Sequence, residues 1–154
     1  MVAAAVAALP GVIAKAPTIA SAPVGPSTRR FANTVVLLRS TDEPPALLRM
    51  LKQIEREFGR RGGRRWGARV IDLDIVLWSG GQWRERTLTV PHAAFRTRDF
   101  VLVPLAAVAG NWRDPLEGRR VRHLAHLVDR PRAGPYLPRA GVRVRSSVGR
   151  ASDF

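Results

Sequence analysis

Hydrophobic and polar side chains alternate most clearly between residues 70 and 78. Successive side chains of a β-strand point to opposite faces of a sheet, so this alternation predicts a strand with two different faces. One predicted face carries Ile71, Leu73, Ile75 and Leu77, and the other carries Asp72, Asp74, Val76 and Trp78. Two carboxylates are therefore expected side by side on one face of the strand.

A helical period precedes this strand between Asp42 and Gly59. Apolar residues recur there at spacings of three and four, which predicts a helix with one apolar stripe. The stripe holds Leu47, Leu48, Leu51, Ile54 and Phe58, and it also includes Glu55. Arg49, Lys52 and Arg56 fall largely outside the stripe.

Weaker patterns predict the remaining elements. Helices are expected at residues 1–9, 98–109 and 121–128, and strands within 12–24, at 31–39 and at 87–90, the last as hairpin partner of 70–78. Strands and helices mix without regular alternation, which favours an α+β sandwich over a doubly wound fold. Residues 1–128 are expected to form one domain, and the Arg/Pro-rich residues 129–154 a disordered tail.

Composition narrows the function classes. The 154 residues include no cysteine, which excludes disulfides and thiolate sites and fits a reducing, cytoplasmic location. No apolar run approaches the roughly 20 residues of a membrane helix. Lys+Arg 26 against Asp+Glu 12 gives a net charge of +14. This excess suits a polyanionic ligand, although arginine-rich usage in a GC-rich genome explains it equally well.

Asp72 and Asp74 are the first candidates for chemistry. Carboxylates two apart on a strand lie about 7 Å from one another, and they repel unless a cation neutralises them. Hard oxygen ligands that leave room for water and phosphate are what Mg²⁺ prefers. The alternative is a solvated strand face. The apolar neighbours of the pair favour the metal site.

An arginine- and glycine-rich stretch at residues 59–69 leads directly into the aspartate strand. Its arginines are Arg60, Arg61, Arg64, Arg65 and Arg69, and they surround Trp66. Such a loop could close over a triphosphate and exclude water. It could also be only solvated, or bind single-stranded nucleic acid, although adjacent carboxylates would repel a phosphodiester backbone. His92, after a strand and a proline, could donate to a phosphate oxygen or be structural.

Several motifs together resemble one family. They are A-P-x-G-P at residues 22–26, F-A-N at 31–33, R-W-G-x-R-x-x-D-L-D-I at 65–75, L-T-V-P-H at 88–92, and the segment ending at Phe100 with V-L-x-P-L after it. The set is similar to the 6-hydroxymethyl-7,8-dihydropterin pyrophosphokinases of the folate pathway, over roughly residues 1–128. The resemblance implies a ferredoxin-like α+β fold with an antiparallel sheet. It also implies transfer of pyrophosphate from ATP to the pterin hydroxymethyl group, leaving AMP, by a monomer.

The resemblance also implies a role for individual residues. Asp72 and Asp74 match ligands of two Mg²⁺ ions, and Asp72 also lies near the pterin. The residues that match triphosphate contacts are Arg60, Arg69, His92 and Arg98. Trp66 lies in the lid loop of the family, and Glu55 matches a position near the nucleotide. The pterin-binding matches are Phe31 and Phe100, which would sandwich the ring, Asn33, which would hydrogen-bond it, and Val24 in the A-P-x-G-P segment.

One departure leaves alternatives open. The family normally opens with a strand ending in Gly-Ser-Asn, and Met1 aligns inside the helix that follows it. We therefore expect the first strand to be missing, through either a start codon assigned too far downstream or a truncated, impaired paralogue. Three functions remain: the pyrophosphokinase, a catalytically silent pterin- or nucleotide-binding protein, and a basic nucleic-acid-binding protein, which the aspartates disfavour.

Overall fold

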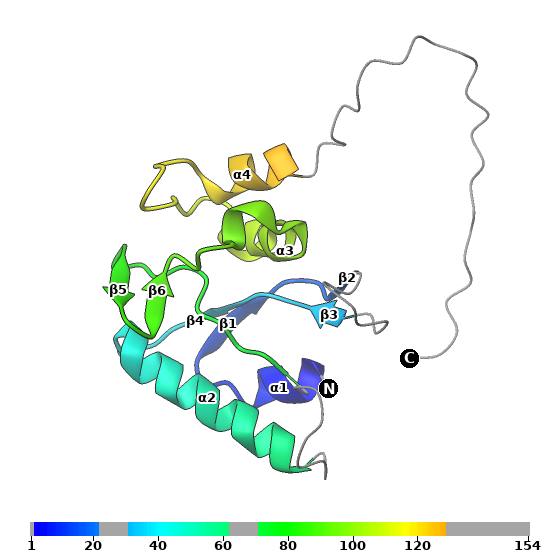
Figure 1. The fold of residues 1–154 in the computed structure, drawn as a ribbon. Coiled ribbons are helices and arrows are strands. Elements are labelled where there is room, and N and C mark those ends of the chain that lie inside the picture. The colour runs from blue at the N-terminus through cyan, green and yellow to red at the C-terminus, as the bar shows by residue number, and fades with distance from the viewer. Residues whose placement is uncertain (1, 22–30, 62–70, 129–154) are drawn as a thin grey trace, which may run out of the picture.

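The computed structural model describes residues 2–21, 31–61 and 71–128 (Figure 1). These residues form four α-helices, one 3-10 helix and six short strands, and every strand pair is antiparallel. The predicted α+β class is therefore confirmed. Most of the arginine-rich stretch, at residues 62–69, and the predicted disordered tail, at 129–154, lie outside the described residues.

The strands pair in three two-stranded sheets. β1 (Val12–Lys15) pairs with β4 (Val36–Leu38), β2 (Ile19–Ser21) with β3 (Phe31–Asn33), and β5 (Trp83–Glu85) with β6 (Leu88–Val90). Each of the first two predicted strands is thus divided in two. Pro17 falls in the first break, where it has no N–H to give to a ladder. Across the same break the Ala16 N–H donates to the Val35 carbonyl at 2.9 Å, so the two pairs stay joined.

The predicted helices are all present. They are α1 (Val2–Ala7), α2 (Pro44–Arg61), α3 (Asp99–Ala109) and α4 (Val121–Val128), with the 3-10 helix η1 (Phe95–Thr97) before α3. Figure 1 shows α1 and α2 on one side of the β1–β4 pair, and α3 and α4 on the other. Helices therefore lie on both sides of the β1–β4 pair (Figure 1).

The buried apolar residues form two hydrophobic clusters. The first comes from η1, α3 and α4, and contains Phe95, Leu102, Leu105, Ala109, Val121, Leu124 and Ala125. The second lies against α2, and contains Leu9, Leu51, Ile54, Ile75, Leu88 and Val90. Residues 71–78 contribute to both clusters. Ile71, Leu73 and Trp78 pack on the second, and Val76 and Leu77 on the first.

Residues 71–78 depart from the strand predicted for them. Residues 71–77 join no ladder within the described residues, and Trp78 forms only an isolated bridge with Gly81. The predicted hairpin with residues 87–90 is also wrong, because β6 pairs with β5 instead. A cavity, described below, lies between this segment and β4, so the two are not close enough to form a ladder there.

The alternation itself is preserved over the first half of the segment. Asp72 and Asp74 are exposed, whereas Leu73 is half-buried and Ile75 is buried. The predicted faces fail from Leu77, which packs with Val76 on the first cluster. The chain turns just beyond this point, with the Gly81 N–H donating to the Trp78 carbonyl at 3.1 Å, and the change of direction ends the alternation.

No helix among the residues described is long and apolar enough to cross a lipid bilayer.

A buried ion pair connects η1 to the turn before α4. Asp114 has no exposed surface, and its two carboxylate oxygens accept from Arg96 Nε and Nη2 at 2.5 and 2.6 Å. Burial acts to raise the pKa of Asp114, but hydrogen bonds from Arg96 and the Leu116 N–H outweigh burial and hold that pKa below its ordinary value of 3.8. The pair therefore stabilises the packing of η1 against the α3–α4 connection when Asp114 is ionised.

We expect Asp114→Asn to lower the free energy of unfolding by about 2–3 kcal/mol at neutral pH, since hydrogen bonds to charged groups contribute roughly 1.5–3 kcal/mol. Urea denaturation measures the change. Glu117→Gln is the matched control, because Glu117 lies 3.4 Å from Arg96 Nε and is 42% exposed. Its expected cost is below about 1 kcal/mol. Equal losses in the two variants would contradict the assignment.

The stabilisation that Asp114 contributes depends on pH. Because the folded-state pKa of Asp114 is lowered, its stabilisation is complete above the ordinary value of 3.8 and disappears as the pH falls through the folded-state pKa. The stability difference between the unmodified protein and Asp114→Asn should therefore narrow below about pH 4. A difference that stays constant into that range would contradict this explanation.

Candidate active site

Asp72 and Asp74 lie next to one another on the solvent side of residues 71–78. Their side chains are 53% and 46% exposed, and Leu73 between them packs on the second cluster. Burying a carboxylate is unfavourable whereas burying Leu73 is favourable, so the alternation favours the register that leaves both aspartates in water. The predicted carboxylate pair is therefore present at one solvent-facing edge of the molecule.

His92 is held beside this pair by its backbone. Its N–H donates to the Val76 carbonyl at 3.0 Å, which connects the end of β6 to the aspartate segment. The Ala94 N–H donates to Nδ1 at 3.2 Å, so the proton of the neutral ring belongs on Nε2. Nε2 lies 4.0 Å from Asp74 Oδ2. This distance exceeds a hydrogen bond, so the Nε2–H can still donate to a ligand.

Two α2 side chains reach the aspartate segment from the opposite direction. Glu55 Oε1 accepts from the Leu73 N–H at 2.6 Å and from Lys52 Nζ at 2.8 Å. Lys52 Nζ also lies 3.4 Å from the Leu73 carbonyl oxygen and 3.6 Å from Asp72 Oδ1. The aspartate segment is therefore attached to α2 by a charged pair.

The charge of Lys52 is stabilised by these neighbours. Burial acts to lower the pKa of Lys52, but the hydrogen bond to Glu55 and the Glu55 charge outweigh it. Asp72 and Asp74 add to this effect, so the pKa of Lys52 lies above its ordinary value of 10.5. Lys52 is thus cationic at neutral pH.

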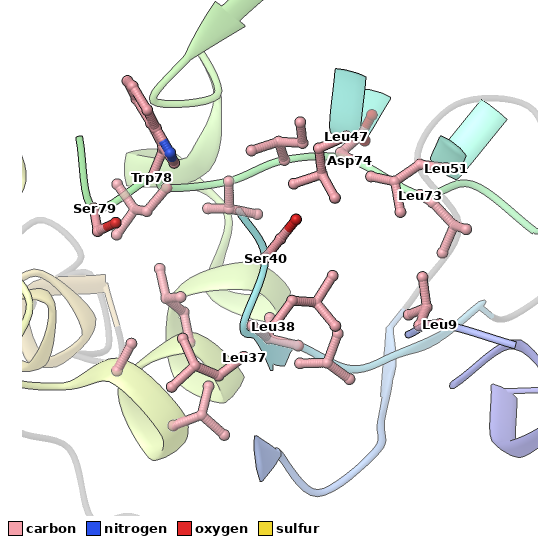
Figure 2. Close-up of a pocket in the computed structure, with 18 of the residues that line it drawn as sticks. Leu9, Leu37, Leu38, Ser40, Leu47, Leu51, Leu73, Asp74, Trp78 and Ser79 are labelled. Carbon is pink, nitrogen blue, oxygen red and sulfur yellow. The ribbon is translucent and has the colours of Figure 1, made fainter. Parts of the chain in front are cut away.

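Two cavities flank the aspartate segment. The larger, of about 230 Å³, lies between β4 and residues 72–79. Figure 2 shows Leu37 and Leu38 on one side of it, and Leu73, Asp74 and Trp78 on the other. It is mostly apolar and reaches into the interior of the molecule. The smaller, of about 190 Å³, lies between α1, the β3–β4 connection and residues 71–73.

The smaller cavity brings Asn33 and Asp72 to one space, together with apolar residues of α1. Asn33 Nδ2 donates to Ser21 Oγ at 2.8 Å across the β2–β3 pair, which leaves its carbonyl oxygen to accept from a ligand. Phe31, two residues earlier on β3, is 47% exposed. An amide, a carboxylate and an available aromatic suit a flat heterocycle that forms hydrogen bonds at its edge.

Arg98 and Phe100 form a separate pair at the beginning of α3. The Arg98 guanidinium carbon lies 5.8 Å from the Phe100 ring centroid, within the range of a cation–π contact. Arg98 is exposed and Phe100 is half-buried. The contact keeps the guanidinium near the ring while leaving its donors accessible.

The other predicted site residues, Val24, Trp66 and Arg69, lie outside the described residues, as does the side chain of Arg60. Lys52 was missed, because it falls outside the apolar stripe of its helix and no role was assigned to it. Its spacing of three from Glu55 was the available signal, since such residues are neighbours on a helix.

The donor set fits Mg²⁺. Two exposed carboxylates supply hard oxygen ligands, and Mg²⁺ commonly takes one or two such ligands and completes its coordination with water and phosphate oxygens. A site built by protein ligands alone is not found: the described residues contain no group of three or more His, Cys, Asp or Glu side chains suited to a metal. Asp72 and Asp74 would hold the ion only jointly with a phosphate-bearing ligand.

Several known proteins similar to this chain carry the same name. Proteins named 2-amino-4-hydroxy-6-hydroxymethyldihydropteridine pyrophosphokinase, from Synechocystis and Pseudomonas aeruginosa, are 40% identical over 114 residues and 41% identical over 113 residues. These matches cover 74% and 73% of this chain, and 58% and 69% of the relatives. A protein of the same name from Methylorubrum extorquens is 40% identical over 106 residues, 67% of each chain. The chain thus spans between about half and about two thirds of the length of these relatives.

A family model gives the same result over most of the chain. The model described as 7,8-dihydro-6-hydroxymethylpterin-pyrophosphokinase (HPPK) matches residues 1–110. The match contains Asn33, Glu55, both aspartates and His92. The chain belongs to the 7,8-dihydro-6-hydroxymethylpterin-pyrophosphokinase (HPPK) family.

Proposed function

We propose that this protein transfers pyrophosphate from ATP to the hydroxymethyl group of 6-hydroxymethyl-7,8-dihydropterin, releasing AMP, in folate biosynthesis. The observation that carries the proposal is the exposed Asp72–Asp74 pair with His92 Nε2 4.0 Å from Asp74. Family membership and the name of the relatives support the same reaction.

In the proposed reaction, the attacking oxygen of the pterin and the leaving AMP lie on opposite sides of the β-phosphorus of ATP. The hydroxymethyl oxygen attacks the β-phosphorus of ATP, the bond from that phosphorus to the oxygen shared with the α-phosphate breaks, and AMP leaves while the hydroxyl proton passes to solvent. Two Mg²⁺ ions, when bound to Asp72 and Asp74, would neutralise the phosphate charge. The task of this chain is to orient both substrates and to keep its carboxylates and donors in place.

We assign the pterin to the smaller cavity. Its residues Asn33 and Asp72 offer an amide and a carboxylate to the polar edge of the ring. Phe31 and Phe100 are proposed to sandwich the ring faces, with Val24 contributing to the same site. The exposure of Phe31 supports this, because a half-exposed phenylalanine gains apolar contact when a flat ligand covers it.

We assign the nucleotide to the side of the aspartate pair nearer His92. The proposed contacts to the triphosphate and nucleotide are Arg60, Trp66, Arg69, His92 and Arg98, and Glu55 is proposed to lie near the nucleotide. His92 Nε2 lies 4.0 Å from Asp74 Oδ2, close to where a phosphate oxygen sharing the metal would lie. The exposed Arg98 adds a cation suited to bidentate phosphate contact.

We further propose that the strands belong to a ferredoxin-like antiparallel sheet. The larger cavity separates β4 from residues 72–79, and apolar side chains line both sides of it. One more apolar strand in that space would join the two segments and give residues 71–77 the ladder that their alternation indicates. A monomer in the cytoplasm remains the expectation from the sequence.

Asp74→Ala tests the metal assignment. We expect it to reduce AMP formation from ATP, the pterin and Mg²⁺ by at least about 100-fold, because metal contacts contribute several kcal/mol and each 1.36 kcal/mol changes the rate tenfold. Glu85→Ala, at an exposed position on β5, should retain the full rate. AMP release at an equal rate in Asp74→Ala would show that the metal assignment is wrong.

The AMP assay, combined with a binding measurement, also distinguishes the enzyme from the main alternative. A truncated or impaired paralogue would bind the pterin or the nucleotide without releasing AMP. Fluorescence titration of the pterin against the unmodified protein, beside the AMP assay, therefore distinguishes an enzyme from a binding protein. Binding without AMP would favour the paralogue.

Asn33→Ala tests the pterin site. We expect the pterin dissociation constant to rise about 3- to 10-fold, since one hydrogen bond contributes roughly 0.5–1.5 kcal/mol. Fluorescence titration measures it, and ATP affinity should change little. Asn111→Ala is the matched control, because Asn111 accepts hydrogen bonds from Arg120 and Arg122 in the α3–α4 region. A similar loss in both variants would argue against the assigned cavity.

A further inference from the structure

The Lys52–Glu55 pair contacts both polar groups of a single residue. The Leu73 N–H donates to Glu55 Oε1 at 2.6 Å, and the Leu73 carbonyl lies 3.4 Å from Lys52 Nζ. In an antiparallel ladder, a hydrogen-bonded residue exchanges its N–H and its C=O with a neighbouring strand. The two α2 side chains thus supply at Leu73 what a ladder would supply.

This attachment is placed at the centre of the aspartate motif. Leu73 is the residue between Asp72 and Asp74, so fixing its N–H and C=O fixes the two peptide planes next to the carboxylates. Residues 71–77 join no ladder within the described part of the chain, so neighbouring strands there do not hold these planes. Among the described residues, α2 is therefore placed to influence the direction of the two aspartates.

Glu55 is well suited to this task. Its side chain is only 13% exposed, and one oxygen accepts both a backbone N–H and the Lys52 ammonium. Lys52 is 34% exposed and lies 3.6 Å from Asp72 Oδ1, so it connects Glu55 to one of the carboxylates directly. A buried carboxylate needs such partners, because without them it costs several kcal/mol.

We infer that Glu55, held by Lys52, is a positioning residue that sets the direction of the Asp72 and Asp74 carboxylates through the Leu73 peptide. The inference rests on the proposed function only in its consequence for the metal. Outer partners that orient metal ligands typically change metal affinity 10- to 100-fold when they are removed. Glu55 thus acts on the ion without having to touch it.

The first experiment needs no metal. Amide hydrogen exchange, followed by NMR in the unliganded protein, should show protection of the Leu73 N–H falling at least about 10-fold in Glu55→Ala. Glu55→Gln should keep most of the protection, because its amide oxygen still accepts. Glu57→Ala is the matched control, being exposed on the same helix. The Val90 amide in the β5–β6 pair reports any global loss of stability.

The second experiment measures metal binding without turnover. Mn²⁺ binding with an α,β-methylene analogue of ATP, followed by water proton relaxation, should weaken about 10-fold in Glu55→Ala and stay unchanged in Glu57→Ala. Glu55→Gln should bind Mn²⁺ with most of the affinity of the unmodified protein. This difference from Glu55→Ala would not be expected if both substitutions acted only by destabilising the helix.

Three results would overturn the inference in different ways. Unchanged Leu73 protection in Glu55→Ala would show that the contact does not hold the peptide. Lost protection with unchanged Mn²⁺ affinity would show that the contact is structural only. If the unmodified protein binds no Mn²⁺ with the analogue, the proposed function and the metal consequence both fail, and the Leu73 exchange result shows separately whether the peptide is held.

Discussion

Partners for the backbone of residues 71–78 are the constraint on which the other features depend. The segment lies between the two hydrophobic clusters and contributes side chains to both, so it cannot leave all of its N–H and C=O groups to water. Within the described residues it meets no strand. Its backbone partners include the His92 N–H at the Val76 carbonyl, the Gly81 N–H at the Trp78 carbonyl, and the Lys52–Glu55 pair at Leu73.

Two of these backbone contacts, those at Val76 and Leu73, also bring a polar side chain to the site. The bond that satisfies Val76 holds His92 beside Asp74, and the bond that satisfies Leu73 holds Lys52 beside Asp72. Backbone pairing and assembly of the site are therefore one event in this fold. A change that loosened residues 71–78 would disturb the carboxylates, the imidazole and the ammonium together.

The local parts of this arrangement could be predicted from the sequence, and the non-local parts could not. Helical periodicity predicted α2, and alternation predicted that Asp72 and Asp74 share one face of their segment, because both patterns depend on near neighbours. The predicted partner of β6 was wrong, since strand pairing depends on which segments lie side by side in the folded chain. Lys52 was missed because its target peptide is 21 residues away, although its neighbour Glu55 is three residues along.

The buried position of Asp114 could not be predicted from the sequence either. Its burial and its pairing with Arg96 join positions 18 residues apart, and neither residue stands out in the sequence. A charged residue is expected in water until a partner is known, and the partner becomes visible only when η1 and the turn before α4 come together.

The register of the aspartates follows from two independent effects. A slip by one residue would exchange the faces of the segment, burying both carboxylates and exposing Ile71, Leu73 and Ile75. The hydrophobic cluster opposes that slip from one side. The Glu55 hydrogen bond opposes it from the other, because a slipped chain would present a different peptide to a carboxylate fixed on α2. A neighbouring strand would hold several peptides at once, whereas Glu55 holds one, and that one lies between the two carboxylates whose direction matters.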